Sequence, residues 1–165
     1  MHHGYVARPD PDRWRIRADV EVRRVQDPTT LRDAIDVARL SFGRDVEEIT
    51  EERVRDELGQ CAGPDARVRR FVAYDRATGA PLSSGGMNLF PGLGLGFFWG
   101  GGTVPEGRGR GAYAAVVAAR LQDAAQAGCG LVGMYARVGT SAPIVERQGF
   151  EKHGPLVTWL RGRRE

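Results

Sequence analysis

The feature that most constrains the fold of this chain is the stretch from residue 97 to residue 127. Residues 97–104 (FFWGGGTV) are aromatic, then glycine-rich, then β-branched, and Pro105 follows them, which predicts a strand. Residues 105–111 (PEGRGRG) predict a tight loop. Residues 112–127 are rich in alanine and carry apolar residues on roughly one face. They predict a helix that Gly128 ends.

A strand, a glycine loop and a helix in this order are typical of phosphate binding. The N-terminus of a helix carries partial positive charge, and its free backbone N–H groups point at an anion. Glycines let a ligand come close to the backbone. Arg108 and Arg110 add charged hydrogen-bond donors to the same loop. The stretch therefore predicts an anion site at the start of the helix.

Two common nucleotide motifs fit this loop poorly. Gly107, Gly109 and Ala112 match the dinucleotide fingerprint G-x-G-x-x-A. That fingerprint also needs an acidic residue about 20 positions further on, and residues 131–134 contain none. The P-loop needs Lys-Ser or Lys-Thr after its last glycine, and neither pair follows Gly111.

A third motif fits better. The segment Arg108–Tyr113 (RGRGAY) resembles the acetyl-CoA pyrophosphate loop of the GNAT N-acetyltransferase superfamily, written Q/R-x-x-G-x-G/A. Arg108 and Gly111 match it, whereas Tyr113 stands where a small residue is usual. Residues 141–150 (SAPIVERQGF) resemble the later helix of the family and its closing Gly-Phe. Both segments lie in the order and at the separation usual in the family, and the resemblance covers roughly residues 20–161.

The resemblance implies an α/β (α+β) fold with a mixed, mostly antiparallel sheet of about six to seven strands and helices on both faces. The fourth and fifth strands are expected to be a parallel pair that splays apart. The residue patterns agree, because short turns predict antiparallel neighbours and a crossover helix predicts a parallel pair. Helices are predicted from Asp27-Pro28 to Gly43 and over about 45–58, and strands over 69–75, 81–90, 95–104 and 131–136.

The two ends of the chain give weaker patterns. Residues 1–13 are polar and contain Pro9 and Pro11, which predicts a flexible N-terminal arm. Residues 14–22 alternate between apolar and charged side chains, which predicts a half-buried strand at the start of a single domain, 14–165. The alternation breaks at residues 23–24, which predicts a bulge or bend. Residues 150–153 and 156–160 are predicted to close the sheet.

Composition excludes several classes of protein. No apolar run approaches the roughly 20 residues of a membrane span, so we expect no membrane partner. The two cysteines have no metal spacing, which predicts no metal and a reducing, cytoplasmic location. Every basic residue except Lys152 is an arginine, but the 21 acidic residues are interspersed, so we expect no nucleic acid partner. A third interpretation is that Arg108 and Arg110 contact single-stranded nucleic acid. It fits poorly, because their loop is short and leads into a regular helix.

The resemblance also implies which residues hold acetyl-CoA as a co-substrate. The cofactor would lie where the fourth and fifth strands splay apart. Its pantetheine arm would pair with the backbone of one segment, and backbone amides of the loop would hold its pyrophosphate. The implied residues are Gly102, Thr103 and Val104 for the arm, and Arg108, Gly109, Arg110, Gly111, Ala112 and Tyr113 for the pyrophosphate.

The reaction implied by the family is direct attack of an amine on the thioester. Family members often protonate the departing thiolate with a tyrosine of the late helix, but Val145 stands at that position and cannot donate. Tyr135 and Ser141 are candidates for the missing proton donor. The alternative for Tyr135 is a packed strand tyrosine, and the alternative for Ser141 is a helix cap. The fourth strand holds no acid, so His153 is a candidate base, against a structural role.

Two functions follow from the sequence. The first is an N-acetyltransferase that transfers an acetyl group to a primary amine of a small molecule or a protein, as a monomer or homodimer. The second is a catalytically degenerate relative that binds CoA as a sensor or interaction module. The absent tyrosine and glutamate favour the second function, and the intact loop fits both.

Overall fold

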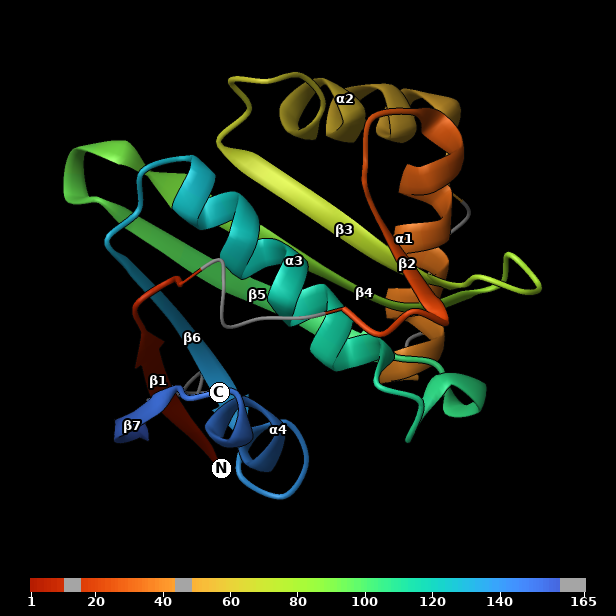
Figure 1. The fold of residues 1–165 in the computed structure, drawn as a ribbon. Coiled ribbons are helices and arrows are strands. Elements are labelled where there is room, and N and C mark those ends of the chain that lie inside the picture. Colours follow the sequence, from red (N-terminus) through yellow and green to blue (C-terminus); the bar gives the residue numbers. More distant parts are fainter. Residues whose placement is uncertain (11–15, 44–48, 158–165) are drawn as a thin grey trace, which may run out of the picture.

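The computed structural model describes residues 1–10, 16–43 and 49–157, which form one seven-stranded sheet with helices on both faces (Figure 1). The strands are β1 (His2–Ala7), β2 (Val20–Arg24), β3 (Val68–Asp75), β4 (Pro81–Phe90), β5 (Leu95–Thr103), β6 (Leu131–Arg137) and β7 (Glu151–Leu156). The helices are α1 (Pro28–Phe42), α2 (Glu51–Cys61), α3 (Ala112–Gln126) and α4 (Ala142–Arg147), with short 3₁₀ turns at Pro91–Leu93 and Pro105–Gly107.

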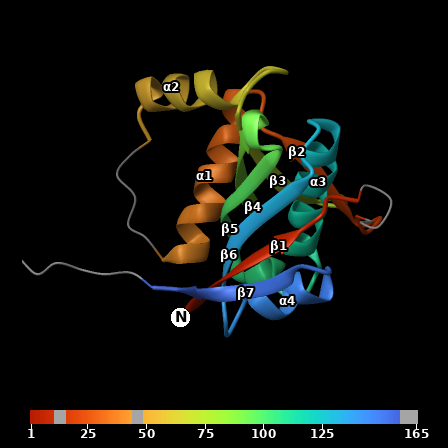
Figure 2. The same ribbon diagram turned by 90° about the vertical axis from the view of Figure 1, so that its left-hand side faces the viewer.

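The sheet has the order β2-β3-β4-β5-β6-β1-β7. Its pairs are antiparallel except β5 with β6, which are parallel. Helices α1 and α2 lie on one face and α3 and α4 on the other (Figure 2). The predicted fold class is therefore confirmed, including the parallel pair. The crossover helix α3 between β5 and β6 accounts for it, because parallel neighbours need a long connection.

Helix α1 has the boundaries that its sequence signals predict. The Asp27 side chain accepts a hydrogen bond from the Thr30 amide at 2.9 Å, and Pro28 occupies the first turn. Gly43 ends the helix in the left-handed conformation. Helix α2 begins later than predicted, at Glu51, where the Thr50 side chain caps it. Residues 44–48 of the predicted second helix lie outside the described residues.

The N-terminal residues form an interior strand. Strand β1 pairs with β6 on one side and β7 on the other. Tyr5 is buried, and its hydroxyl donates a hydrogen bond to Glu146 of α4 at 2.7 Å. The predicted flexible arm is wrong for His2–Ala7, because Tyr5 and Ala7 bury one face of this short strand. Pro9 follows the strand, so this proline lies just beyond its end, whereas Pro11 lies outside the described residues.

Strands β1 and β2 lie near opposite edges of the sheet (Figure 1). Just before β2, Ile16 packs against the core, and Arg17 lies beside Gly111 at the start of α3. The predicted strand is shorter than expected. It starts at Val20, whereas Ile16 is not in a strand and Trp14 lies outside the described residues. The predicted bulge is also wrong, because residues 23 and 24 pair with β3 in unbroken register.

The C-terminal prediction is confirmed for one strand. Strand β7 runs from Glu151 to Leu156 at the edge of the sheet and joins the two predicted segments. Residues 158–160 of the second segment lie outside the described residues.

Candidate active site and cofactor loop

Strands β5 and β6 separate part of the way along their length. Their parallel pairs run from Leu95 with Leu131 to Phe98 with Met134. Beyond that point β5 continues to Thr103, whereas residues 135–137 of β6 pair with β1. We call the opening between residues 99–103 of β5 and 135–137 of β6 the fork. The predicted splay is confirmed, and it leaves one backbone edge of β5 without a strand partner from β6.

A β-bulge lies in β5 beside the fork. Gly86 pairs with Trp99 and Ser84 pairs with Gly102, so one residue of β4 opposes two of β5. Gly100 and Gly101 both lie opposite Gly85, so β5 has one extra residue here. Gly100 has a φ of 61°, which favours glycine. A bulge leaves backbone groups unpaired and redirects them. Gly100 and Gly101 therefore interrupt the regular pairing with β4 next to the fork.

The backbone of β5 faces the fork at alternate residues. The Gly102 carbonyl accepts a hydrogen bond from the Ser83 hydroxyl at 2.7 Å, and the Val104 amide donates to the Leu82 carbonyl at 3.0 Å. Both groups therefore point toward β4. Because neighbouring residues in a strand direct their backbone groups to opposite sides, the amide and carbonyl of Thr103 face the fork. Of the three residues predicted for the pantetheine arm, Thr103 has the suitable orientation.

The predicted pyrophosphate loop leads directly into α3. Gly109 and Gly111 have φ values of 74° and 78°, so both use the left-handed region. The first helical hydrogen bond joins the Ala115 amide to the Gly111 carbonyl at 2.9 Å. The amides of Ala112 and Tyr113 therefore have no acceptor within the helix. A Cβ on Gly109 would meet no atom within 4 Å, so the loop is open where an anion would approach. These groups fit a diphosphate.

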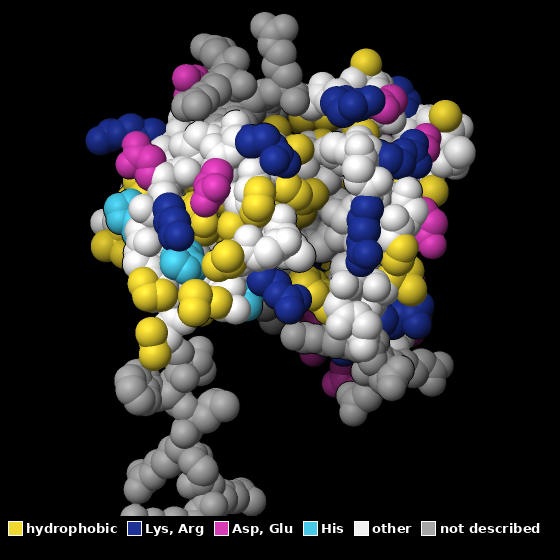
Figure 3. Space-filling view, turned by 90° about the horizontal axis from the view of Figure 1, so that it is seen from below, with side chains coloured by type: hydrophobic (Ala, Val, Ile, Leu, Met, Phe, Trp, Pro, Cys, Tyr) yellow, Lys and Arg dark blue, Asp and Glu magenta, His cyan; other side chains and the backbone are white. Residues whose placement is uncertain are grey.

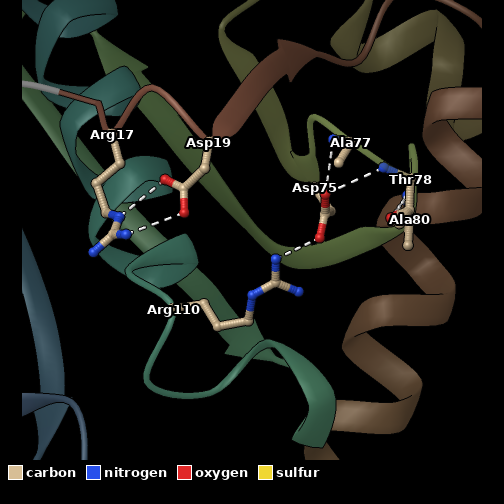
Figure 4. A network of polar contacts seen from close by, with 7 residues as sticks. All are labelled: Arg17, Asp19, Asp75, Ala77, Thr78, Ala80 and Arg110. Atoms are coloured by element: carbon tan, nitrogen blue, oxygen red, sulfur yellow. Dashed lines mark hydrogen bonds and ion pairs between the residues drawn. The ribbon is translucent and has the colours of Figure 1, made fainter.

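Arg110 does not extend from the loop as a free donor. Its guanidinium pairs with the carboxylate of Asp75 at the end of β3 (Figure 4). Asp75 also accepts hydrogen bonds from the Ala77 amide at 2.8 Å and the Thr78 amide at 3.2 Å. Arg110 and then these amides hold the pKa of Asp75 below its usual range. Arg110 thus fastens the loop to the β3–β4 turn, whereas Arg108 is exposed.

The large Tyr113 fits because glycine stands opposite it. A Cβ on Gly101 would lie only 2.7 Å from Cε2 of Tyr113, so the tyrosine ring packs against the bulge of β5. Burial raises the pKa of the Tyr113 hydroxyl, and the nearby guanidinium of Arg120 partly opposes that increase.

Sequence reasoning missed Arg120, which is fully buried in the core. Its Nη1 donates to the Gly86 carbonyl at 3.0 Å, and its guanidinium carbon lies 4.5 Å from the centre of the Phe98 ring. Its Nη2 has no hydrogen-bond partner among the described residues. Burial lowers its pKa to about 10, so it remains charged at pH 7. The sequence signal that could have identified Arg120 is its place on the apolar face of α3, one helical turn from both Val116 and Ala124.

The three catalytic candidates lie in different places. Tyr135 is the first residue of β6 beyond the last pair with β5, at the mouth of the fork. It is half exposed, and its ring meets Phe97 edge to face with centroids 5.5 Å apart. The Ser141 hydroxyl accepts a hydrogen bond from the Arg137 amide at 2.9 Å and makes no side-chain cap to α4. His153 lies on β7, and β1 separates that strand from β6.

Two properties of the described residues concern membranes and nucleic acids as partners. Residues 1–10, 16–43 and 49–157 contain no helix that is long and apolar enough to span a membrane. On the face seen in Figure 3, the described Lys and Arg side chains are scattered among acidic and apolar ones. They form no continuous basic block there.

No family model matches the sequence, and no curated protein matches it. Solved structures do match. A GCN5-related N-acetyltransferase from Kribbella flavida has a TM-score of 0.66 at 17% identity, over 92% of this chain and 54% of that one. Glucosamine-6-phosphate N-acetyltransferase from Arabidopsis thaliana has a TM-score of 0.71 at 14% identity, over 86% of this chain and 97% of that one.

AAC(6')-Iy, solved in complex with the bisubstrate analogue CoA-S-monomethyl-acetylneamine, has a TM-score of 0.65 at 16% identity, over 88% of this chain and 99% of that one. This chain spans a little over half the length of the Kribbella protein and of a Staphylococcus epidermidis protein of unknown function. At these identities the likeness concerns the fold. The chain has the fold of the GNAT superfamily.

Proposed function

We propose that this protein is an acetyl-CoA-dependent N-acetyltransferase that acts on a primary amine of a small molecule or a protein. The observation that carries the proposal is the position of the fork beside the glycine loop at the start of α3. One edge of β5 can pair with an extended arm there, while loop amides receive a diphosphate. Bound acetyl-CoA would supply the thioester that an amine attacks.

The chain's own residues would hold the cofactor mainly through backbone groups. The amide and carbonyl of Thr103 would pair with the pantetheine arm. The amides of Gly109, Gly111, Ala112 and Tyr113 would bind the pyrophosphate, with Arg108 as an exposed cation nearby. The Arg110 amide donates to the Gly107 carbonyl at 3.4 Å and closes the loop. Gly102 and Val104 would keep β5 in register with β4 through the hydrogen bonds that they already make.

Catalysis would rest on position and on one hydroxyl. A backbone amide of the bulge at Gly100 and Gly101 would polarise the thioester carbonyl. Tyr135 would donate a proton at the fork, because it is the predicted candidate that lies there. Strand β5 carries no acid, so the amine would arrive neutral or lose its proton to water. The rate would then climb with pH for an alkyl amine, whose pKa is roughly 10.4.

The second candidate function is a CoA-binding sensor or interaction module without turnover. The specific observation in its favour is Val145, which stands where the family often has a tyrosine and is fully buried. Val145 packs in the main core, so the residue at this position is part of the packing and provides no proton.

Turnover separates the two functions. Release of free CoA thiol would be measured with acetyl-CoA and a panel of alkyl amines, α-amines and lysine peptides, together with CoA binding by calorimetry. We expect thiol release with at least one amine, and a drop of about 10²-fold in kcat for Tyr135→Phe with CoA affinity unchanged. Binding without release for any amine would favour the sensor, and no binding of CoA would contradict both functions.

The proposal includes a cytoplasmic location and a monomer or homodimer. Cys61 and Cys129 support a reducing location, because both are free and buried.

A further inference from the structure

The segment that enters β2 brings a cation to the cofactor loop. Arg17 lies just before β2, and its Cδ is 2.8 Å from the position that a Cβ on Gly111 would take. Its Nε is 3.7 Å from the same position. Gly111 directly precedes α3, so the Arg17 side chain lies over the loop that is proposed to hold a diphosphate. The resemblance to the family does not include this residue.

The backbone around Arg17 is fixed by hydrogen bonds. The Val20 amide donates to the Arg17 carbonyl at 3.1 Å and closes a turn. Arg76 donates from its amide to the Asp19 carbonyl at 3.0 Å, and from its Nε to the Ala18 carbonyl at 2.9 Å. Arg76 follows Asp75, the partner of Arg110. The turn that carries Arg17 and the loop are therefore fastened to the same end of β3 (Figure 4).

The guanidinium of Arg17 has a weak partner. Its Nε and Nη2 contact Asp19 Oδ1 and Oδ2 at 3.0 and 3.1 Å, and both side chains are more than half exposed. An exposed ion pair of this kind contributes little, because water screens the two charges. A phosphate group is also bound by arginine in a bidentate manner, with stronger charge-assisted hydrogen bonds. A phosphate on the loop can therefore take the guanidinium from Asp19.

We propose that Arg17 is a phosphate-binding residue of the cofactor site, and that Asp19 holds its guanidinium when no phosphate is bound. The inference rests on the proposed function, because it takes the ligand to be CoA. The phosphate is either the pyrophosphate or the ribose 3′-phosphate of CoA, which share this chemistry. The close approach of the side chain to Gly111 and its charge both support the assignment.

The test is calorimetry of CoA binding to the whole chain. The matched control is Arg23, which makes the same two-bond pair with Glu21 at 2.8 and 3.0 Å on β2. We expect Arg17→Ala to weaken CoA binding about tenfold, or roughly 1.4 kcal/mol, and Arg23→Ala to change it less than twofold. Equal effects of the two substitutions would overturn the proposal while CoA binding by the wild type keeps the proposed function intact. No binding by the wild type would overturn both.

Asp19 gives a second, opposite test. Asp19→Asn should tighten CoA binding several-fold in the wild type and leave it unchanged in the Arg17→Ala variant, because Asp19 acts through Arg17. A gain in CoA affinity that persists without Arg17 would mean that the Asp19 carboxylate simply repels CoA. It would overturn the proposed role of Asp19 as the partner of Arg17. Repeating the Arg17→Ala titration with 3′-dephospho-CoA locates the contact. A loss that remains supports the pyrophosphate, and a loss that disappears supports the 3′-phosphate.

Discussion

Two arginines of the α3 region have opposite surroundings. Arg110, in the loop before the helix, is partly exposed and pairs with Asp75. Arg120, in the middle of the helix, is fully buried, and no described carboxylate pairs with it. This partly exposed pair ties the loop to β3, and we expect it to add little stability. The buried charge lies under the bulge of β5, where burial lowers its pKa and packing holds it in place.

This difference indicates that the exposed and the buried arginines have different roles. Exposed arginines at the loop can exchange their partners for a phosphate, because water screens and replaces their ion pairs. Arg120 cannot exchange its neighbours, so its positive charge stays fixed beneath β4 and β5. A fixed charge of this kind contributes to the potential at the fork without contacting a substrate. Substitutions at four positions test this comparison, in order of decreasing expected effect on stability.

The largest effect is expected for Arg120→Ala. The substitution leaves a cavity in the core, and we expect a loss of about 2–5 kcal/mol in the free energy of unfolding, measured in urea. Arg120→Met fills the space without a charge and should stay within about 1 kcal/mol of the wild type, because apolar replacement of a buried charge is often neutral. A methionine variant as unstable as the alanine variant would mean that the charge itself stabilises the fold.

Gly85→Ala should show how tightly Arg120 is held. The added Cβ would lie 3.1 Å from Cζ of Arg120 and 3.2 Å from Cγ1 of Val116. We expect a loss of about 1–3 kcal/mol from overpacking. The loss should shrink in the Arg120→Met background, because methionine is flexible. A loss of the same size in both backgrounds would place the strain on Val116.

Tyr5→Phe tests a buried polar group that does have a partner. The Tyr5 hydroxyl donates to Glu146, and we expect its removal to cost about 1–2 kcal/mol at pH 7. Burial and Glu146 raise the pKa of Tyr5 to about 12, so the native state keeps a proton that the unfolded state loses near pH 10. The difference between the wild type and the variant should therefore be full below pH 10 and vanish by about pH 12. A difference independent of pH would contradict this assignment.

The smallest effect is expected for Arg110→Ala. Its ion pair is partly exposed, and Asp75 keeps two backbone amides as partners. We expect a change below about 1 kcal/mol in the free energy of unfolding, measured in urea beside the Arg120 variants. A loss as large as that of Arg120→Ala would remove the distinction between the two arginines.

Much of the fold could be predicted from the sequence because its signals are local. Asp27, Pro28 and Gly43 bound α1 through capping and backbone preferences. The glycine loop and the alanine-rich helix likewise predicted the start of α3. The parallel pair followed from the crossover connection. Each of these signals depends on residues that are close together in the chain.

The missed features depend on contacts between distant residues. Strand β1 is too short for a clear alternation, and its place between β6 and β7 is set by pairing with strands that lie far along the chain. The ion pairs of Arg110 and Arg17 were invisible because a sequence does not show which acid an arginine meets. The burial of Arg120 required knowing that Gly85 leaves space for it.

The proposed function depends above all on CoA phosphates binding to backbone groups of the loop before α3. The most direct test compares Gly109→Asp with Gly109→Asn by calorimetry with CoA. Gly109 has a φ of 74° and open space around its Cβ position, and both side chains tolerate that conformation. The two variants differ only in charge. We predict that the aspartate variant binds CoA at least about tenfold more weakly than the asparagine variant. Equal affinities, or no binding of CoA by the wild type, would contradict the claim.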